Sequence, residues 1–306
     1  MTEIFGSLVT REIEDSPPSL KFPIIISISG KGGVGKTNIV INLAFAFAKL
    51  HKNVFLLDGD LGLPNIHTLL GLVPKYNISH FIKQQEMIWQ FLIDGPRGIK
   101  ILPGSSGDLQ LMNLNAREKI SLIGNLELVA KTMDIFLIDT ESGLSSNVLF
   151  FNMMASNSII IITPEPTSIN NAQALIKELS KKTKKKKIAI LVNCVRNKEE
   201  GVKVFEKFVK IVDRSLGNLL SLDFWGFVPF DQKLQEAVRK QRAVLDMCPQ
   251  APSSCSFMKV AKRILERVPS QREGPDYPFL FRPISKYYLP ALHRTDDGNK
   301  DINLES

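Results

Sequence analysis

The chain is poor in cysteine, and its apolar runs are short. It has only three cysteines, Cys194, Cys248 and Cys255, and no two of them form a Cys-x-x-Cys pair. The N-terminus also lacks the basic start and apolar stretch of a secretion signal, so the sequence argues against disulfides and against an iron–sulfur cluster. The longest apolar runs, such as residues 159–162, are far too short to span a bilayer. We therefore expect a soluble protein of the reducing cytosol.

Acidic residues are outnumbered, with 31 Asp and Glu against 39 Lys and Arg, which gives a net charge of +8. Two segments carry more than this net charge, the lysine run at 181–187 with +6 and the stretch 259–294 with +5, which leaves −3 for the rest of the chain. The rest of the chain is close to neutral, so the location of the charge matters more than its size. A lysine run before a strand is usually a solvated loop, and the alternative is contact with anionic lipid or nucleic acid.

The strongest motif starts at residue 23, where a β-branched apolar run breaks into glycines and apolar residues at helical spacing follow. The glycine segment and the start of the helix consist of Gly30, Lys31, Gly32, Gly33, Val34, Gly35, Lys36, Thr37 and Asn38. This is the strand, loop and helix of a P-loop. Its glycines let N–H groups face phosphate oxygens, while Lys36 adds charge at the β- and γ-phosphates and Thr37 offers a hydroxyl to Mg²⁺. A glycine-rich turn that binds nothing is the alternative.

Strand-like runs recur along the chain, mostly with helical patterns between them. They lie at 23–29, 53–58, 99–102, 134–139, 158–163, 187–193 and 223–228. This alternation predicts an α/β fold, a doubly wound, mostly parallel sheet with helices on both faces. We expect one domain over 23–268, a flexible segment over 1–22 and an irregular tail over 269–306.

Acidic residues stand at two of the predicted strand ends, where parallel sheets bind their ligands. Asp58 and Asp60 follow the second run, and the strand period of two points both side chains toward the phosphates. Asp139 ends the fourth run as a Walker B aspartate does, which holds Mg²⁺ through water. With the P-loop upstream, Thr37, Asp58 and Asp139 are the candidate metal residues.

Lys31 narrows the class, because Lys-Gly-Gly-Val-Gly-Lys-Thr resembles the deviant P-loop of the MinD/ParA family of dimerising ATPases. Residues 58–66 and 225–242 are most similar to the FlhG/FleN members, which regulate flagellar number and placement. The resemblance runs from about residue 23 to 268. It implies a MinD-like P-loop NTPase fold, ATP and Mg²⁺ as ligands, and an ATP-dependent homodimer.

The resemblance also implies roles for single residues. Lys31 would reach the partner's phosphates across the dimer, Asp60 would orient the attacking water and Asp58 would support the Mg²⁺ shell, so the candidate catalytic residues are Lys31, Lys36 and Asp60. Around the base and the dimer seam, the implied residues are Asn193 and Arg196 at adenine, Pro229, Phe230 and Asp231 beside base and ribose, and Glu165 at the seam. For Glu165, a simple turn acid is the alternative. Ser168 is expected to cap the following helix.

The second switch departs from the family pattern, which continues after the aspartate with Gly or Pro and then Ala-Gly. Here Glu141 and Ser142 precede Gly143. A charge at this place is compatible with slow hydrolysis or with another partner, so three hypotheses stay open. The first is a Mg²⁺-dependent ATPase that controls flagellar number or placement, and the second is an ATP-sensing regulator or anti-activator without appreciable hydrolysis. The third is a MinD-like division-site or ParA-like partitioning ATPase.

The expected partners also follow from the resemblance. They are a second copy of the chain and flagellar assembly or regulatory proteins, namely a FlhF-like GTPase, the C-ring or a transcription activator. Residues 1–22 lack the Asp-Gln-Ala-x-x-Leu-Arg motif of many FlhG proteins, which argues against stimulation of that GTPase. The aromatic and basic stretch 277–294 suits an anionic membrane surface, with a tail packed on the body as the alternative. We expect a cytoplasmic protein, free or peripheral at the inner membrane face, and no DNA partner.

Overall fold

The computed structural model describes residues 23–84, 87–105, 114–183, 185, 187–217 and 220–268. Within these residues one eight-stranded sheet forms in the order β3-β4-β2-β5-β1-β6-β7-β8. Neighbouring strands run parallel except at the edge, where β3 is antiparallel to β4. The predicted α/β fold is therefore confirmed. The segments expected at 1–22 and 269–306, with the membrane-contact stretch 277–294, lie outside the described residues.

The seven predicted strand runs each correspond to a strand, and among the described residues only the two-residue β3 was not expected. The strands are β1 (Ile24–Gly30), β2 (Val54–Gly59), β3 (Ile93–Asp94), β4 (Lys100–Leu102), β5 (Ile135–Thr140), β6 (Asn157–Ile162), β7 (Lys187–Val195) and β8 (Ser221–Pro229). The helices are α1 (Lys36–Lys49), α2 (Ile66–Leu69), α3 (Ile78–Gln84), α4 (Ala116–Ala130), α5 (Ser146–Met154), α6 (Pro166–Lys182), α7 (Lys198–Leu216), α8 (Gln232–Arg239), α9 (Val244–Met247) and α10 (Pro252–Arg267). Two 3-10 turns, η1 (Ile88–Phe91) and η2 (Pro96–Gly98), lie between α3 and β4. None of these described helices is long and apolar enough to cross a membrane.

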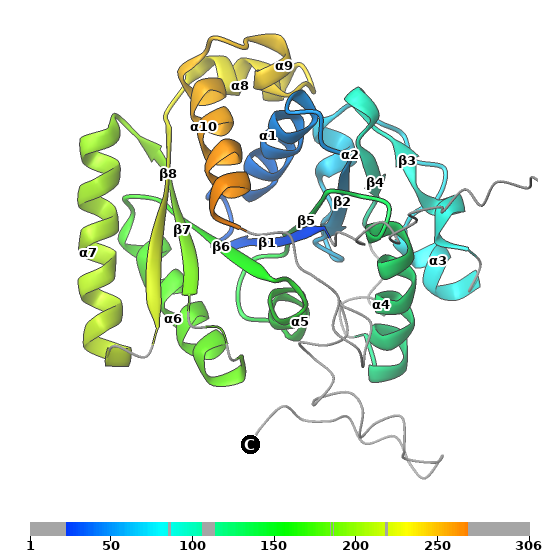
Figure 1. Cartoon of the computed structure of the whole chain (residues 1–306), viewed down its shortest axis with the longest axis horizontal. Coiled ribbons are helices and arrows are strands. Elements are labelled where there is room, and N and C mark those ends of the chain that lie inside the picture. The colour runs from blue at the N-terminus through cyan, green and yellow to red at the C-terminus, as the bar shows by residue number, and fades with distance from the viewer. Residues whose placement is uncertain are drawn as a thin grey trace, which may run out of the picture.

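The central strand β1 shows why this sheet is covered on both faces. Its Ile24, Ile26 and Ile28 pack in a core with α1, α9 and α10, whereas Ile25 packs on the opposite face with α4 and α5. Successive strand side chains point to opposite faces, so a nearly all-apolar run is stable only when both faces are buried. Figure 1 shows this arrangement, with α1, α8, α9 and α10 above the sheet and α4, α5 and α6 below it.

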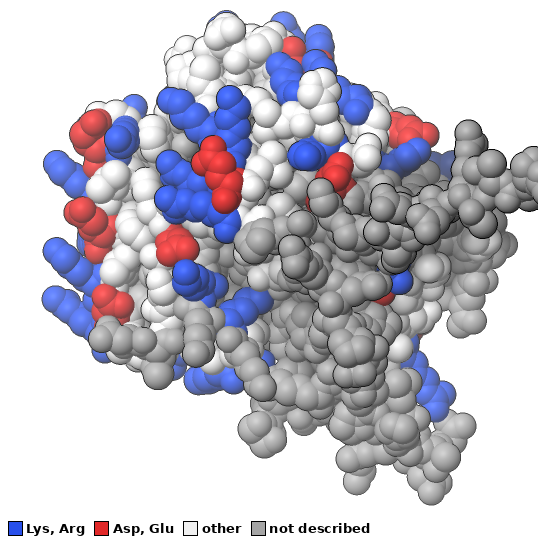
Figure 2. Space-filling model, in the orientation of Figure 1, with Lys and Arg blue, Asp and Glu red and all other residues white. Residues whose placement is uncertain are grey.

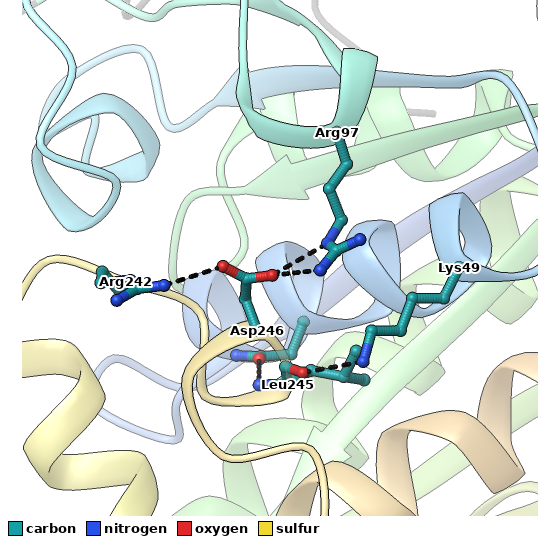
Figure 3. A network of polar contacts seen from close by, with 6 residues as sticks. Lys49, Arg97, Arg242, Leu245 and Asp246 are labelled. Carbon is teal, nitrogen blue, oxygen red and sulfur yellow. Dashed lines mark hydrogen bonds and ion pairs between the residues drawn. The ribbon is translucent and has the colours of Figure 1, made fainter.

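A polar network holds α9 against α1 and η2, as Figure 3 shows. Asp246 accepts hydrogen bonds from Arg97 Nε and Arg242 Nη2, each at 3.0 Å. Two side chains of α1 bond to the backbone of Leu245. Asn42 Oδ1 accepts from its N–H, and Lys49 Nζ donates to its carbonyl, both at 3.2 Å. Because α1 starts at the P-loop, this network fixes the helix on which the loop is mounted.

One expected helix cap is wrong. Helix α6 begins at Pro166, so Glu165 is its N-cap residue, and the Glu165 side chain makes no capping bond. Ser168 lies inside the helix, is buried, and accepts a hydrogen bond from the Thr163 N–H at 3.0 Å. Proline is favoured at the first helical position because its missing N–H would have no partner there. The helix therefore starts before Ser168.

Candidate nucleotide-binding site

The three sequence motifs meet at one edge of the sheet. Strand β5 lies between β2 and β1, and its register places Asp139 beside Asp58 on one side and beside Ile28 on the other. The P-loop, residues 30–37, follows β1 directly. The P-loop and both acids thus lie at the carboxyl ends of three adjacent parallel strands, where α/β sheets bind their ligands.

Backbone conformation and packing both require glycine at the end of the P-loop. Gly35 has a φ of 87° and is the N-cap residue of α1. A Cβ atom there would lie 2.7 Å from Nδ2 of Asn193, which donates a hydrogen bond to the Val34 carbonyl at 2.7 Å. The Asn193 amide was expected at adenine. The structure shows that one of its N–H groups instead donates to the backbone of the P-loop.

Lys36 is buried at the centre of the site, and its Nζ donates to the Lys31 carbonyl at 3.3 Å. Burial lowers the pKa of Lys36, while the negative charges of Asp139, Asp60 and Glu141 oppose this shift. The ammonium group therefore lies among carboxylates beneath the loop. A phosphate group in the loop would give it an anionic partner.

Asp58 and Asp139 form a buried carboxylate pair. Asp58 Oδ2 accepts hydrogen bonds from the N–H groups of Asn65 and Ile66, both at 3.0 Å. Its Oδ1 and the Oδ1 of Asp139 are buried without a hydrogen-bond partner. Burial raises the pKa of Asp139 to about 7, although a hydrogen bond with Thr37 lowers it. Burial and the charge of Asp139 likewise raise the pKa of Asp58 well above its usual range.

Two unpaired carboxylate oxygens and the Thr37 hydroxyl fit a hard cation such as Mg²⁺, whose charge would favour the ionised acids. Within the described ranges, no group of three or more His, Cys, Asp and Glu side chains could hold a metal ion. Mg²⁺ usually keeps waters and takes phosphate oxygens rather than an all-protein cage. The candidate metal residues are therefore compatible with the ion.

Asp60 has a different environment from Asp58. It is half-buried at the end of β2, and its Oδ1 accepts a hydrogen bond from the Leu63 N–H at 3.0 Å. Leu63 is 75% exposed, so this loop faces the solvent. The carboxylate of Asp60 is therefore more accessible to solvent than the fully buried carboxylate of Asp58.

Lys31 and Glu165 contact each other within one chain. Lys31 Nζ lies 3.6 Å from Glu165 Oε2 and donates to Thr167 Oγ1 at 2.8 Å. The two charged side chains are 33% and 66% exposed. Exposed ion pairs of this kind contribute about 0–1 kcal/mol, so Lys31 can leave this place at little cost.

The loop after β8 is fixed by Asp231. The buried Asp231 carboxylate accepts bonds from the first turn of α8, from the Ser253 N–H at 3.0 Å and from Ser253 Oγ at 2.7 Å. Both of its oxygens are thus used to join α8 to α10. Between it and Pro229, Phe230 is 58% exposed and offers an apolar ring to a ligand. Asp231 therefore shapes this loop.

Arg196 lies farther from the P-loop motifs, at the end of β7. Its side chain is 85% exposed and pairs with Glu200, with Nη2 and Oε1 3.2 Å apart. The Arg196 N–H also donates to the same carboxylate at 2.6 Å. Glu200 lies in the first turn of α7. The Arg196 side chain would therefore have to leave this ion pair and rotate before it could contact an adenine base.

A buried polar chain that begins at Thr140, the residue before Glu141, was missed from the sequence. It joins, in order, Thr140, Ser29, Asn152, Ser27, Ser158 and Lys185, through hydrogen bonds of 2.8 to 3.1 Å. Buried polar groups are costly unless paired, and here they pair with one another. The sequence did contain a sign of this chain. Ser27 and Ser29 interrupt the isoleucine run of β1 and, being two residues apart, lie on the same face of the strand.

The chain matches known nucleotide-binding proteins. A family model described as the CobQ/CobB/MinD/ParA nucleotide binding domain matches residues 25–244. Among the relatives, the antiactivator FleN of Pseudomonas aeruginosa is 36% identical over 241 residues, which are 79% of this chain and 85% of that protein. The flagellum site-determining protein YlxH of Helicobacter pylori is 28% identical over 254 residues, 83% of this chain and 85% of its own.

Solved structures agree with this assignment. MinD in the MinC:MinD cell division protein complex of Aquifex aeolicus has a TM-score of 0.64 and 26% identity, over 81% of this chain and 99% of that one. The family model spans the P-loop, Asp58, Asp60 and Asp139, and the described strands from residue 25 of β1 to β8. The chain therefore belongs to the MinD/ParA family of P-loop nucleotide-binding proteins and has FleN among its relatives.

Proposed function

We propose that the chain is an ATP-hydrolysing switch that dimerises with ATP and regulates flagellar number or placement. The observation that carries the nucleotide part is the unpaired oxygen pair of Asp58 and Asp139, which lies beside Lys36 under a glycine loop. Family membership supports ATP as the nucleotide. The flagellar part is supported by the name of the relative YlxH, a flagellum site-determining protein, and by the resemblance of residues 58–66 and 225–242 to the FlhG/FleN members.

Each residue of the site would have a separate task. Mg²⁺, when bound, would neutralise charge on the β- and γ-phosphates. Thr37, Asp58 and Asp139 would hold the ion, directly or through water. Lys36 would exchange the Lys31 carbonyl for phosphate oxygens, and Asp60 would position the attacking water, because it is the only one of these three acids that is not fully buried.

Dimerisation would use Lys31. In the single chain its ammonium group contacts Glu165 and Thr167, at the start of α6. In a dimer it would release these weak contacts and reach the phosphates bound by the second copy. Glu165 would then be free to contact a lysine of that copy. The family resemblance supports this arrangement, and the exposure of both side chains makes it accessible.

Phosphate release by the purified full chain tests the proposal. Wild type and Glu206→Ala, which removes an exposed acid of α7, should hydrolyse ATP, whereas Asp60→Ala should be at least about 100-fold slower. Light scattering should show that Asp60→Ala still dimerises with ATP and that Lys31→Ala does not. Equal turnover in Asp60→Ala would remove Asp60 from the mechanism. A monomer at every ATP concentration would contradict the switch.

A second candidate is an ATP sensor without appreciable hydrolysis, favoured by the carboxylate of Glu141 in the second switch. An ATP-dependent wild-type dimer without phosphate release would select this function.

Loss of the gene should change the number or position of flagella counted by electron microscopy. Normal flagella together with misplaced division sites, or salt-sensitive DNA binding by the protein, would select the MinD-like or ParA-like role instead.

A further inference from the structure

We infer that Glu141 is a specificity-determining residue that weakens binding of a nucleoside triphosphate relative to the diphosphate. The inference rests on the proposed function, because it assumes that the P-loop binds adenine nucleotides. It goes further by assigning a role to a residue that departs from the family pattern. Glu141 follows β5 directly and is half-buried, whereas Ser142, Gly143 and Leu144 after it are exposed.

The backbone position of Glu141 places it at the γ-phosphate end of the site, because it comes two residues after Asp139, which lies beside Asp58 in the register of β5 and β2. These two acids are the candidate residues for the Mg²⁺ of the β- and γ-phosphates. The electrostatic neighbours of Glu141 agree with this position. Its carboxylate interacts with the charges of both Asp60 and Lys36. Lys36 serves the β- and γ-phosphates, and Asp60 serves the water that attacks the γ-phosphate from outside. A carboxylate close to both lies near the γ-phosphate rather than near the α-phosphate or the base.

Two supports hold Glu141 in this place. Its Oε1 accepts a short hydrogen bond from the Ser145 hydroxyl. Ser145 is the N-cap residue of α5, and its hydroxyl accepts in turn from the Val148 N–H at 3.2 Å. The Glu141 carbonyl also accepts from Thr140 Oγ1 at 3.2 Å. The carboxylate is therefore fixed to the first turn of α5 and is not free to swing into solvent.

The loop that carries Glu141 lies close to the P-loop. A Cβ atom on Gly32 would lie 3.6 Å from Oγ of Ser142, the residue after Glu141. Glu141 thus follows β5, the strand beside β1, and precedes a residue that lies close to the P-loop. This proximity places the negative charge near the phosphates.

Charge balance makes the effect specific for the γ-phosphate. Mg²⁺ would offset Asp58 and Asp139, and Lys36 alone would face the phosphates, since Lys31 is engaged with Glu165 in the single chain. Lys36 is the cation near Glu141, and it would be shared with the phosphates, so the charge of Glu141 would be offset only in part. A diphosphate ends before this carboxylate, whereas a triphosphate places its additional charge close to it. A unit charge at roughly 7 Å in a dielectric of about 40 changes affinity by about tenfold.

Glu141→Gln tests this role, because Gln removes the charge and can still accept the Ser145 bond. The matched control is Glu206→Gln, which removes one exposed charge from α7. The measurement is calorimetric titration of the full chain with Mg·ADP and with a non-hydrolysable ATP analogue, at a protein concentration where light scattering shows single copies. Glu141→Gln should bind the analogue about tenfold more tightly and ADP within about twofold of wild type. Glu206→Gln should change neither affinity.

Unchanged ADP binding also shows that the variant is folded at this site. An unchanged ratio of the two affinities in Glu141→Gln would overturn the inference, as would weaker binding of the analogue. Equal tightening of both nucleotides would overturn it too, because the charge would then act on the whole nucleotide. Wild-type protein that binds neither nucleotide would refute the proposed function itself, a result that is distinct from the others.

Discussion

Replacing Asp139 by Asn should stabilise the nucleotide-free protein. Burial raises the pKa of this carboxyl to about 7, from 3.8 in its ordinary environment. Each unit of difference corresponds to about 1.4 kcal/mol, which sets an upper limit of about 4 kcal/mol above neutral pH. Part of this is shared with Asp58, and Asn keeps only part of the Thr37 contact, so we expect a gain of about 1–3 kcal/mol in the free energy of unfolding.

The sign of the pH dependence follows from the raised pKa. Below about pH 4 the carboxyl is protonated in both states and costs nothing. Between about pH 4 and 7 the folded chain keeps a proton that the unfolded chain has lost, so wild-type stability falls as the pH rises. Asp139→Asn removes this contribution, and its advantage should therefore be larger near pH 8 than near pH 5.

Urea unfolding followed by tryptophan fluorescence in EDTA measures both effects. Asp213→Asn, which neutralises an exposed acid of α7, should leave stability within about 0.5 kcal/mol of wild type. Mg·ADP should stabilise wild type and should stabilise Asp139→Asn much less. A variant that is no more stable than wild type near pH 8, or an advantage that is equal at both pH values, would refute the reasoning.

Three further substitutions test parts of the fold and the site. Burial lowers the pKa of Lys185 to about 7, so wild-type stability should rise between about pH 7 and 10 by up to about 1.4 kcal/mol per pH unit. Lys185→Met should remove this rise in urea unfolding, and an identical slope would contradict it. Burial opposes the change, but hydrogen bonds from two arginines lower the pKa of Asp246. Asp246→Asn should therefore cost about 1–2 kcal/mol near neutral pH. This loss should begin to shrink below about pH 4, where the unfolded acid takes up its proton, and should disappear only at a lower pH, where the folded carboxyl is protonated too. Unaltered thermal unfolding near neutral pH would exclude that stabilising role. Asn193→Ala should weaken Mg·ADP binding about tenfold or more, because the P-loop loses the hydrogen bond from Asn193 to the Val34 carbonyl. An unchanged affinity in calorimetry would show that the P-loop keeps its conformation without this bond.

The sequence predicts the sheet well because local pattern and global packing agree in it. The isoleucine-rich run of β1 and the apolar run before Asp139 can be satisfied only by strands buried on both faces. The P-loop likewise depends on local residue types, because glycine conformations and the positions of Lys36 and Thr37 follow from spacing alone. These features needed no knowledge of distant contacts.

Other features depend on residues that are distant in the sequence and could not be predicted from it. The Asp231 carboxylate accepts a hydrogen bond from Ser253, 22 residues later in the chain. The Asn193 amide donates to the carbonyl of Val34, 159 residues earlier. In both cases the polar group that suits a ligand contacts the protein itself. The position of Lys185 depends on Ser158 in the same way. Tertiary packing decides such pairings, whereas residue type only makes them available.

The most direct test of the account is calorimetric titration of Mg·ATP into the purified full chain, with Lys36→Ala as the comparison. The account predicts saturable binding of one nucleotide per chain in wild type. It also predicts loss of this binding in Lys36→Ala with an unchanged circular dichroism spectrum. Absence of binding heat in wild type, or equal affinity in both proteins, would contradict the claim that this glycine loop binds a triphosphate.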